Sequence, residues 1–194
     1  MAEVNISQDI KTSLTGLAAA SITNITRKIA IAVNLISNSV WVGTVPLTGW
    51  SHPATDDGAT PAGASSLDSG SIAYRFLASA GREFFRQNLS LSVSTTYTLS
   101  FFVEAFVQTT NSEVVYLSGL VGVTGDHVTS GAVRIRLADL TVGQRFETTF
   151  TTAADGVGLL DVGAGAASSA TEDVTLSAFQ LETGSSALEY EPTT

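Results

Sequence analysis

The sequence has 194 residues, no cysteine and a formal net charge of −9, from 18 acidic residues against 9 Lys and Arg. The absence of cysteine excludes disulfides and thiolate chemistry, and the presence of only two histidines argues strongly against a multi-histidine metal site. Because phosphate groups require a basic partner surface, we expect neither a nucleic acid nor an anionic membrane as partner. The length is that of one domain, or of one domain with an appendage.

Residues 1–29 differ in pattern from the rest of the chain. Ile6, Ile10, Leu14 and Leu17 recur at steps of 4, 4 and 3 residues, which is typical of one face of a helix. The apolar phase then slips, and a run rich in threonine disfavours a longer helix. We therefore expect a short helix or an extended arm, which either packs on the domain or anchors the protein to a larger assembly through this apolar stripe.

The N-terminal sequence carries no targeting or membrane signal. Residues 1–4 lack the basic region of a signal peptide. The apolar stretch 28–36 is interrupted by Asn34 and is too short to span a bilayer. We expect synthesis in a cytosol.

Residues 30–194 have the pattern of a β-domain. Ile31, Val33 and Leu35 alternate with smaller or polar residues, which is the period of a strand. No helical segment separates the strand candidates, so alternating β-α-β units are excluded. The sequence predicts an all-β, antiparallel β-sandwich. Further strand candidates lie at 72–78, 83–93, 96–108, 113–121, 131–138, 145–152, 157–163 and 173–182.

Three segments allow finer predictions. Residues 97–107 carry apolar side chains on both faces, which predicts a central strand that is buried on both sides. Within 173–182 the apolar positions change phase, which predicts a bulge near Ala178. Residues 51–71 are rich in Gly, Ser, Pro and Asp and predict a long loop of the functional or mobile kind.

The end of the chain has the most specific pattern. Residues 180–182 read Gln-Leu-Glu, and Gly184, Ala187, Tyr190 and the Pro-Thr pair 192–193 follow at fixed spacing. This ending resembles the closing strand of carbohydrate-binding-module-like jelly-roll domains found in bacteriophage virion proteins. The motifs are structural, so they indicate a fold more strongly than a role.

Three further segments match the same family, and together the resemblance covers roughly 30–194. Residues 33–38, 97–103 and 145–152 resemble its opening, central and penultimate strands. The resemblance implies a jelly roll in a non-enzymatic virion structural protein. With the chain taken as complete from its Met, it implies a capsid decoration (cement) or head-fibre protein, expected to be a homotrimer bound to other virion proteins. The alternative is a tail-fibre or baseplate adhesin that binds host surface glycans.

The ending also has a reading in physical terms. Leu181 completes the last core strand and Gly184 supplies a turn. Leu188 and Tyr190 are predicted to lay an apolar lid over the open edge of the sandwich, and Pro192 to stop further strand pairing.

Aromatic residues are the candidates for glycan binding, because an exposed ring stacks on the apolar face of a pyranose while polar neighbours bind the hydroxyls. The candidates are Trp41, Trp50, Tyr74 and Tyr116. The alternative for the two tryptophans is packing at the end of the sandwich or in a subunit interface.

Catalytic machinery is sparse, and we expect no enzymatic activity. His52 and His127 lie in turns, where an isolated histidine is solvated, and no Gly-x-Ser-x-Gly elbow is present. Glu104 and Glu147 are the candidates for a glycosidase carboxylate pair. The alternative for Glu104 is an ion pair with an arginine such as Arg134 or Arg136.

No cofactor is expected. Jelly-roll carbohydrate modules often carry a structural calcium, and acidic residues occur in or near turns at 56–57, 126, 155 and 172–173. Asp beside Gly is common in turns that bind no metal, so we favour ordinary turns over a calcium site.

Overall fold

The computed structural model describes residues 34–41, 47–53, 58–79, 81–107, 111–154, 156–166 and 172–193. The predicted N-terminal helix or arm, with its Ile6, Ile10, Leu14 and Leu17 stripe, lies outside these residues. Within the described ranges, no helix has the length and apolar character needed to cross a membrane.

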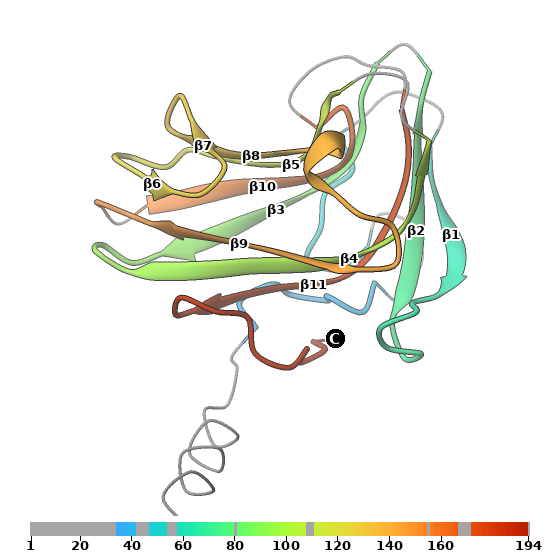
Figure 1. Ribbon diagram of the computed structural model, residues 1–194, viewed down its shortest axis with the longest axis horizontal. Helices are drawn as coiled ribbons and strands as arrows, with labels where there is room; N and C mark the ends of the chain where they lie inside the picture. The colour runs from blue at the N-terminus through green and yellow to red at the C-terminus, as the bar shows by residue number, and fades with distance from the viewer. Residues whose placement is uncertain are drawn as a thin grey trace, which may run out of the picture. The chain divides into compact units, whose positions relative to one another are not determined.

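Two antiparallel sheets form the two layers of the domain (Figure 1). The six-stranded sheet has the order β1-β2-β11-β4-β9-β6, and the five-stranded sheet has the order β3-β10-β5-β8-β7. The elements are β1 (Ala59–Ala64), β2 (Ile72–Ala78), β3 (Glu83–Leu91), β4 (Thr96–Val107), β5 (Glu113–Ser118), β6 (Thr124–Gly125), β7 (Val128–Thr129), β8 (Ala132–Arg136), the 3₁₀ helix η1 (Leu137–Asp139), β9 (Arg145–Thr151), β10 (Gly156–Ala164) and β11 (Glu172–Thr183).

The strand order is that of a jelly roll. Without the edge strands β1, β6 and β7, the sheets read β2-β11-β4-β9 and β3-β10-β5-β8. The first and last of these strands are therefore neighbours, and the chain crosses between the sheets at nearly every connection. The structure confirms the predicted all-β sandwich.

Strand β1 is an element that the sequence analysis missed, because it lies inside the predicted loop 51–71. It pairs with β2 along the edge of the six-stranded sheet. Five of its six residues are exposed, so it lacks the alternation of a strand with one buried face. It is a strand because its backbone pairs with β2, and such pairing produces no hydrophobic pattern in the sequence.

The core is aromatic around Trp41, whose side chain is fully buried. Five rings have centroids between 5.0 and 5.9 Å from its own: Trp50, Tyr74, Phe76, Phe85 and Phe179. Phe179 also stacks on Phe101 of β4 at 4.8 Å. Each such pair contributes about 0.5–1.5 kcal/mol beyond the area that it buries.

The bulge predicted near Ala178 is confirmed. The register of β11 against β4 shifts between Ser177 and Gln180, and Ala178 has a φ of 50°. The inserted position lets Leu176 and Phe179 both belong to the hydrophobic core. Ser177 donates a hydrogen bond to Glu104 of β4, and Gln180 accepts one from the Glu191 N–H.

The predicted central strand 97–107 is β4, which lies between β11 and β9. Its core-facing side includes Leu99 and Phe101, both fully buried. Thr98 and Ser100, on the opposite side, are fully buried as well. The second face is buried at these two residues, near the end of the chain, whereas Phe102, Glu104 and Phe106 on the same face are half-buried.

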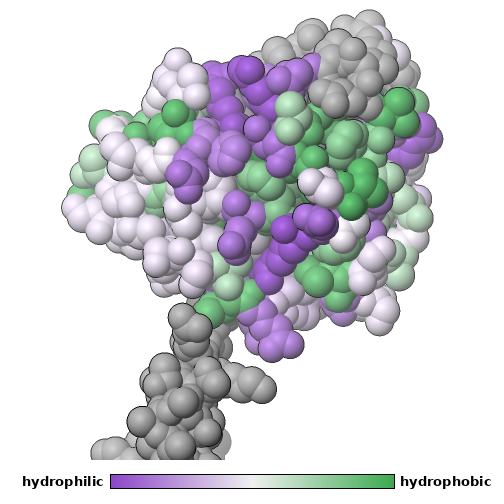
Figure 2. Space-filling model, in the orientation of Figure 1, coloured by the Kyte–Doolittle hydropathy of each residue, from purple (hydrophilic) through white to green (hydrophobic). Residues whose placement is uncertain are grey.

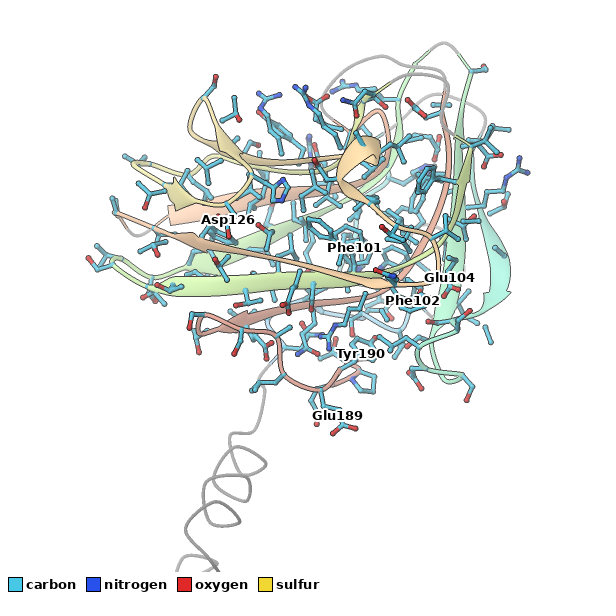
Figure 3. The ribbon with its side chains drawn as sticks, in the orientation of Figure 1. Phe101, Phe102, Glu104, Asp126, Glu189 and Tyr190 are labelled. Atoms are coloured by element: carbon cyan, nitrogen blue, oxygen red, sulfur yellow. The ribbon has the colours of Figure 1, made fainter. Side chains whose placement is uncertain are left out.

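Residues 184–193 cross the outer face of the six-stranded sheet, on the side away from the five-stranded sheet (Figures 1 and 3). Glu182 of β11 accepts a hydrogen bond from the Leu188 N–H at 2.7 Å. Gln180 accepts one from the Glu191 N–H at 2.7 Å. Arg145 of β9 donates to the Leu188 carbonyl at 2.6 Å, and burial lowers the pKa of its guanidinium.

The apolar lid over the sandwich edge is therefore wrong in both position and chemistry. The tail lies on a sheet face and is held mainly by hydrogen bonds. Tyr190 shares its hydroxyl with Ser39 and Ser71 at 3.0 and 3.1 Å, and burial raises the pKa of this phenol. The alternation of residues in the sequence does not reveal that the outward polar side chains of β11 form hydrogen bonds with the tail.

We expect Gly163→Ala to lower the free energy of unfolding by about 3 kcal/mol, because β10 passes very close to β3 at this residue. An added Cβ would clash with the Glu83 carbonyl and lie 2.8 Å from the Phe84 Cα. Gly143→Ala is the control: its φ is +75°, with no atom within 4 Å of an added Cβ, so only backbone strain of about 1 kcal/mol applies. Chemical denaturation measures both, and equal losses would contradict the close approach.

Candidate functional site

Three of the four predicted glycan-stacking residues belong to the core. Trp41, Trp50 and Tyr74 are 0%, 5% and 1% exposed. Their rings pack against other aromatic rings and are not available to stack on a sugar. For the two tryptophans this agrees with the alternative that they pack inside the protein, and for all three residues it corrects the prediction of an exposed platform. A large aromatic ring in a sequence is compatible with either a core or a ligand platform, and these three rings belong to the core.

Tyr116 is the predicted residue that remains at the surface. It lies in β5 between Val115 and Leu117, which are fully buried in the core. Because side chains alternate along a strand, Tyr116 lies on the outer face of the five-stranded sheet, where it is half-buried.

Tyr116 is one member of a row that crosses four strands. The strand register pairs Arg86 of β3 with Asp161 of β10, Asp161 with Tyr116, and Tyr116 with Arg134 of β8. Neighbouring strands are about 4.8 Å apart, so the row spans about 14 Å. We call Arg86, Asp161, Tyr116 and Arg134 the cross-strand row.

The Arg86 end of the row is a closed ion pair. The Nε and Nη2 atoms of Arg86 each donate to one oxygen of Asp161, both at 2.6 Å. Asp161 is 1% exposed, and burial raises the pKa of its carboxyl while the Arg86 guanidinium acts against that rise. Such a bidentate pair fixes both side chains in one orientation.

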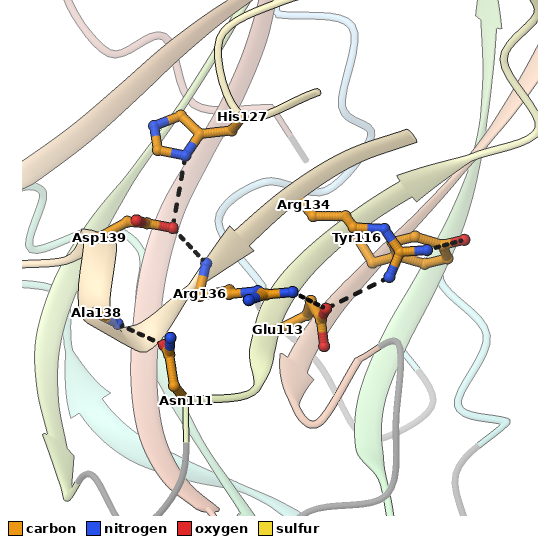
Figure 4. Close-up of polar contacts among 8 residues, drawn as sticks. All are labelled: Asn111, Glu113, Tyr116, His127, Arg134, Arg136, Ala138 and Asp139. Atoms are coloured by element: carbon orange, nitrogen blue, oxygen red, sulfur yellow. Dashed lines mark hydrogen bonds and ion pairs between the residues drawn. The ribbon is translucent and has the colours of Figure 1, made fainter. Parts of the chain in front are cut away.

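The Arg134 end is more loosely bound (Figure 4). The Arg134 guanidinium lies 4.6 Å from the ring centroid of Tyr116, a cation–π contact. Arg134 and Arg136 reach the same oxygen of Glu113, at 3.4 and 3.3 Å. The Nε atom of Arg134 is buried without a hydrogen-bond partner.

This arrangement corrects the expected pairing of Glu104 with Arg134. Arg134 lies in β8, whose neighbour β5 carries Glu113 in the same sheet. Glu104 lies in β4 of the other sheet. Sheet membership, which follows from long-range pairing, decides the partner.

Two further features enlarge the charged face. The guanidinium carbons of Arg82 and Arg86 both lie 5.3 Å from the Phe84 ring centroid. Glu83, which lies between Arg82 and Phe84, is fully buried and contacts His52. Figure 2 shows hydrophilic residues gathered over β5 and β8.

A sequence signal for this face exists in retrospect. Arg134 and Arg136 flank the fully buried Ile135, and Arg82 and Arg86 share the parity of Phe84. Period-two arginines therefore mark the outward face of two strands, although nothing in the sequence shows that these strands share a sheet.

A pocket of about 340 Å³ adjoins the cross-strand row where segment 47–53 runs beside β3. Backbone hydrogen bonds between Ser51 and Arg86 hold this segment to the strand. The volume is at the lower end of the range of about 300–1,000 Å³ for small-ligand sites. We call it the β3-edge pocket, and it is lined by Ser37, Gly49, Trp50, Ser51, Arg86, Gln87 and Asn88.

Both histidines have carboxylate partners, which corrects the expectation that they are simply solvated. The Nε2 atom of His52 contacts Glu83, and this carboxylate also accepts the Gly58 N–H at 3.2 Å. The Nδ1 atom of His127 lies 3.5 Å from Asp139.

The two predicted catalytic carboxylates bind different segments. Glu104 accepts hydrogen bonds from the Ser66 N–H at 2.8 Å and from the Ser177 hydroxyl at 2.7 Å. Burial by itself would raise the pKa of Glu104, but these hydrogen bonds outweigh it and the pKa is lowered. Glu147 is exposed and accepts the Ala187 N–H of the tail at 3.4 Å.

Among the residues that the structure describes, no three His, Asp or Glu side chains gather in a way that could hold a metal ion. Of the candidate calcium ligands, Asp56, Asp57 and Asp155 lie outside the described ranges. Asp126 contacts the Thr149 hydroxyl at 3.5 Å. Asp173 pairs with Arg75 at 2.7 Å.

No family model and no curated protein matches the chain. A solved structure with a similar fold is the enzymatically active domain of tailspike protein 4 of bacteriophage CBA120, at 11% sequence identity and a TM-score of 0.47. The match covers 79% of this chain and 21% of the tailspike chain, so this protein corresponds to about a fifth of it. At this identity the likeness concerns the fold alone.

The comparison corrects one expectation. The prediction that the protein is not an enzyme is contradicted, because the matched domain is described as enzymatically active. A low identity assigns no reaction to this chain, since activity resides in site residues and not in the fold.

We expect Glu104→Gln to lower the free energy of unfolding at pH 7 by about 1 kcal/mol, because charge-assisted hydrogen bonds from Ser66 and Ser177 are lost. The pKa of Glu104 lies below its ordinary value of 4.5, so its stabilisation is present above that pH and is lost as the pH falls through the folded-state pKa. The difference from wild type should therefore narrow below pH 4.5.

Chemical denaturation at pH 7 and at lower pH measures this difference. The control is Glu147→Gln, an exposed carboxylate of the same sheet, which should change stability by less than about 0.5 kcal/mol. A Glu104 effect that is independent of pH would show that its charge is not what the serines stabilise.

Proposed function

We propose that this protein is a bacteriophage virion surface protein whose five-stranded sheet binds host surface glycans, in the manner of a tail-fibre or baseplate adhesin. The observation that carries the proposal is the cross-strand row beside the β3-edge pocket. The resemblance of residues 172–193 to jelly-roll domains of virion proteins supports the setting. The jelly-roll strand order supports the type of module.

The chemistry of the row suits a saccharide. Sugar sites combine an aromatic ring with planar polar groups that bind vicinal hydroxyls. Tyr116 supplies the ring between Asp161 and Arg134. Arg86 belongs to both the row and the pocket, where Asn88 and Ser51 add an amide and a hydroxyl. A span of about 14 Å exceeds one pyranose ring, which favours a chain of sugars over a monosaccharide.

The other reading, a capsid decoration or head-fibre protein, places its docking function in residues 1–29. These residues lie outside the described ranges. The expected homotrimer and the contacts with other virion proteins likewise stay predictions. No observation on the described sandwich favours this reading, and we therefore propose the adhesin.

We expect Tyr116→Ala to weaken binding to its target on an array of bacterial surface polysaccharides at least tenfold, because the row loses its ring and Arg134 loses its stacking partner. The matched control is Phe102→Ala, a half-buried aromatic on the outer face of the other sheet (Figure 3). Binding is measured by interferometry on variants whose unfolding midpoints have been compared.

Equal binding by wild type and Tyr116→Ala would remove Tyr116 from the site. An equal loss in Phe102→Ala would move the site to the other sheet. Absence of binding to every polysaccharide on the array would contradict the proposed function.

A further inference from the structure

Basic residues are concentrated on one face of this acidic protein. The chain carries a net charge of −9. Within the described ranges all six basic residues are arginines, and four of them, Arg82, Arg86, Arg134 and Arg136, lie in or next to β3 and β8 of the five-stranded sheet. A local cluster of like charge in an otherwise opposite field attracts ligands of the complementary sign.

The carboxylates on this face do not balance the four arginines. Asp161 is committed to Arg86 in the closed pair. Glu113 serves both Arg134 and Arg136. Asp139, the remaining acid at the β8 end, accepts the Arg136 backbone N–H at 2.8 Å and faces His127. Among the described residues, three side-chain carboxylates thus lie against four guanidinium groups, and one of the three, Asp139, also faces His127.

The two ends of the row differ in how fully their hydrogen bonds are used. Arg86 meets Asp161 through two bonds of 2.6 Å. Arg134 and Arg136 contact one oxygen of Glu113 at 3.4 and 3.3 Å, and Arg134 also donates to the Tyr116 hydroxyl at 3.5 Å. A guanidinium offers five N–H donors, so most donors of this pair are not taken by the fold. The Arg136 side chain is also 48% exposed.

We propose that the glycan bound on this face is acidic, and that Arg134 and Arg136 hold its carboxylate or phosphate groups. This inference rests on the proposed glycan-binding function and names the ligand class. The planar guanidinium fork matches the two oxygens of a carboxylate or phosphate, which a lysine does not. Tyr116, which is half-buried, orients Arg134 by stacking against its guanidinium.

The test compares an acidic polysaccharide with its own neutral derivative. The probes are a uronic-acid polysaccharide, the same polymer after carboxyl reduction, and a polyglycerol-phosphate chain that carries phosphate in place of carboxylate. We expect at least tenfold tighter binding to one acidic probe than to the reduced polymer, with affinity falling as salt increases. The two acidic probes distinguish carboxylate from phosphate as the bound group.

The variants are Arg136→Gln and Arg136→Lys, with Arg75→Gln as the matched control. Arg75 is 47% exposed and pairs with Asp173 on the other sheet, so it matches Arg136 in exposure and charge. Arg136→Gln should weaken acidic-probe binding at least fivefold and leave the reduced polymer unaffected. Arg136→Lys, which keeps the charge but loses the fork, should recover only part of this loss. Arg75→Gln should bind as wild type.

The outcomes separate the two proposals. Equal affinity for the acidic and reduced polymers would overturn the inference and leave the proposed function standing. An equal loss in Arg75→Gln would overturn it too, because the effect would then be one of net charge. Absence of binding to all three probes, together with binding to neutral polysaccharides of the array, would again overturn the inference alone. Absence of binding to every glycan would contradict both.

Discussion

The change of side-chain phase in β11 is the constraint on which the domain depends. A strand in a sandwich must point alternate residues into one core, yet β11 runs for 12 residues between β2 and β4, and its apolar positions change parity between Leu176 and Phe179. The bulge at Ala178 resolves this conflict. It brings Phe179 against Trp41, which closes the aromatic core. It also turns Gln180 outward, where it binds the tail.

The tail in turn determines which sheet face presents accessible side chains. Residues 184–193 cover the outer face of the six-stranded sheet, so the polar groups of β4 and β11 there are used within the fold. Trp41, Trp50 and Tyr74 are packed in the hydrophobic core. What remains partly exposed, with a ring and several charges in register, is the outer face of the five-stranded sheet around Tyr116. The proposed site therefore lies on the sheet face whose side chains are used neither by the core nor by the tail.

Local pattern predicted much of the fold. Apolar side chains on both faces identified β4 as a central strand, and a change in the phase of the apolar positions identified the bulge, because both are properties of consecutive residues. Strand β1 was missed because it is an edge strand with an exposed, Gly- and Pro-containing sequence. Of the four candidate glycan-stacking residues, only Tyr116 is at the surface. Aromatic type does not distinguish core from ligand platform, and sheet membership, not proximity in sequence, made Glu113 and not Glu104 the partner of Arg134.

The sequence by itself determined the β-class, the single sandwich and the position of the phase change, since each follows from the order of neighbouring residues. Only the tertiary structure decided which charges meet. Arg86, Asp161, Tyr116 and Arg134 come from four distant segments, and they form a row because strand register aligns them. For the same reason a net charge of −9 concealed a local arginine cluster. Composition averages over the whole surface, whereas pairing between distant strands places like charges on one face.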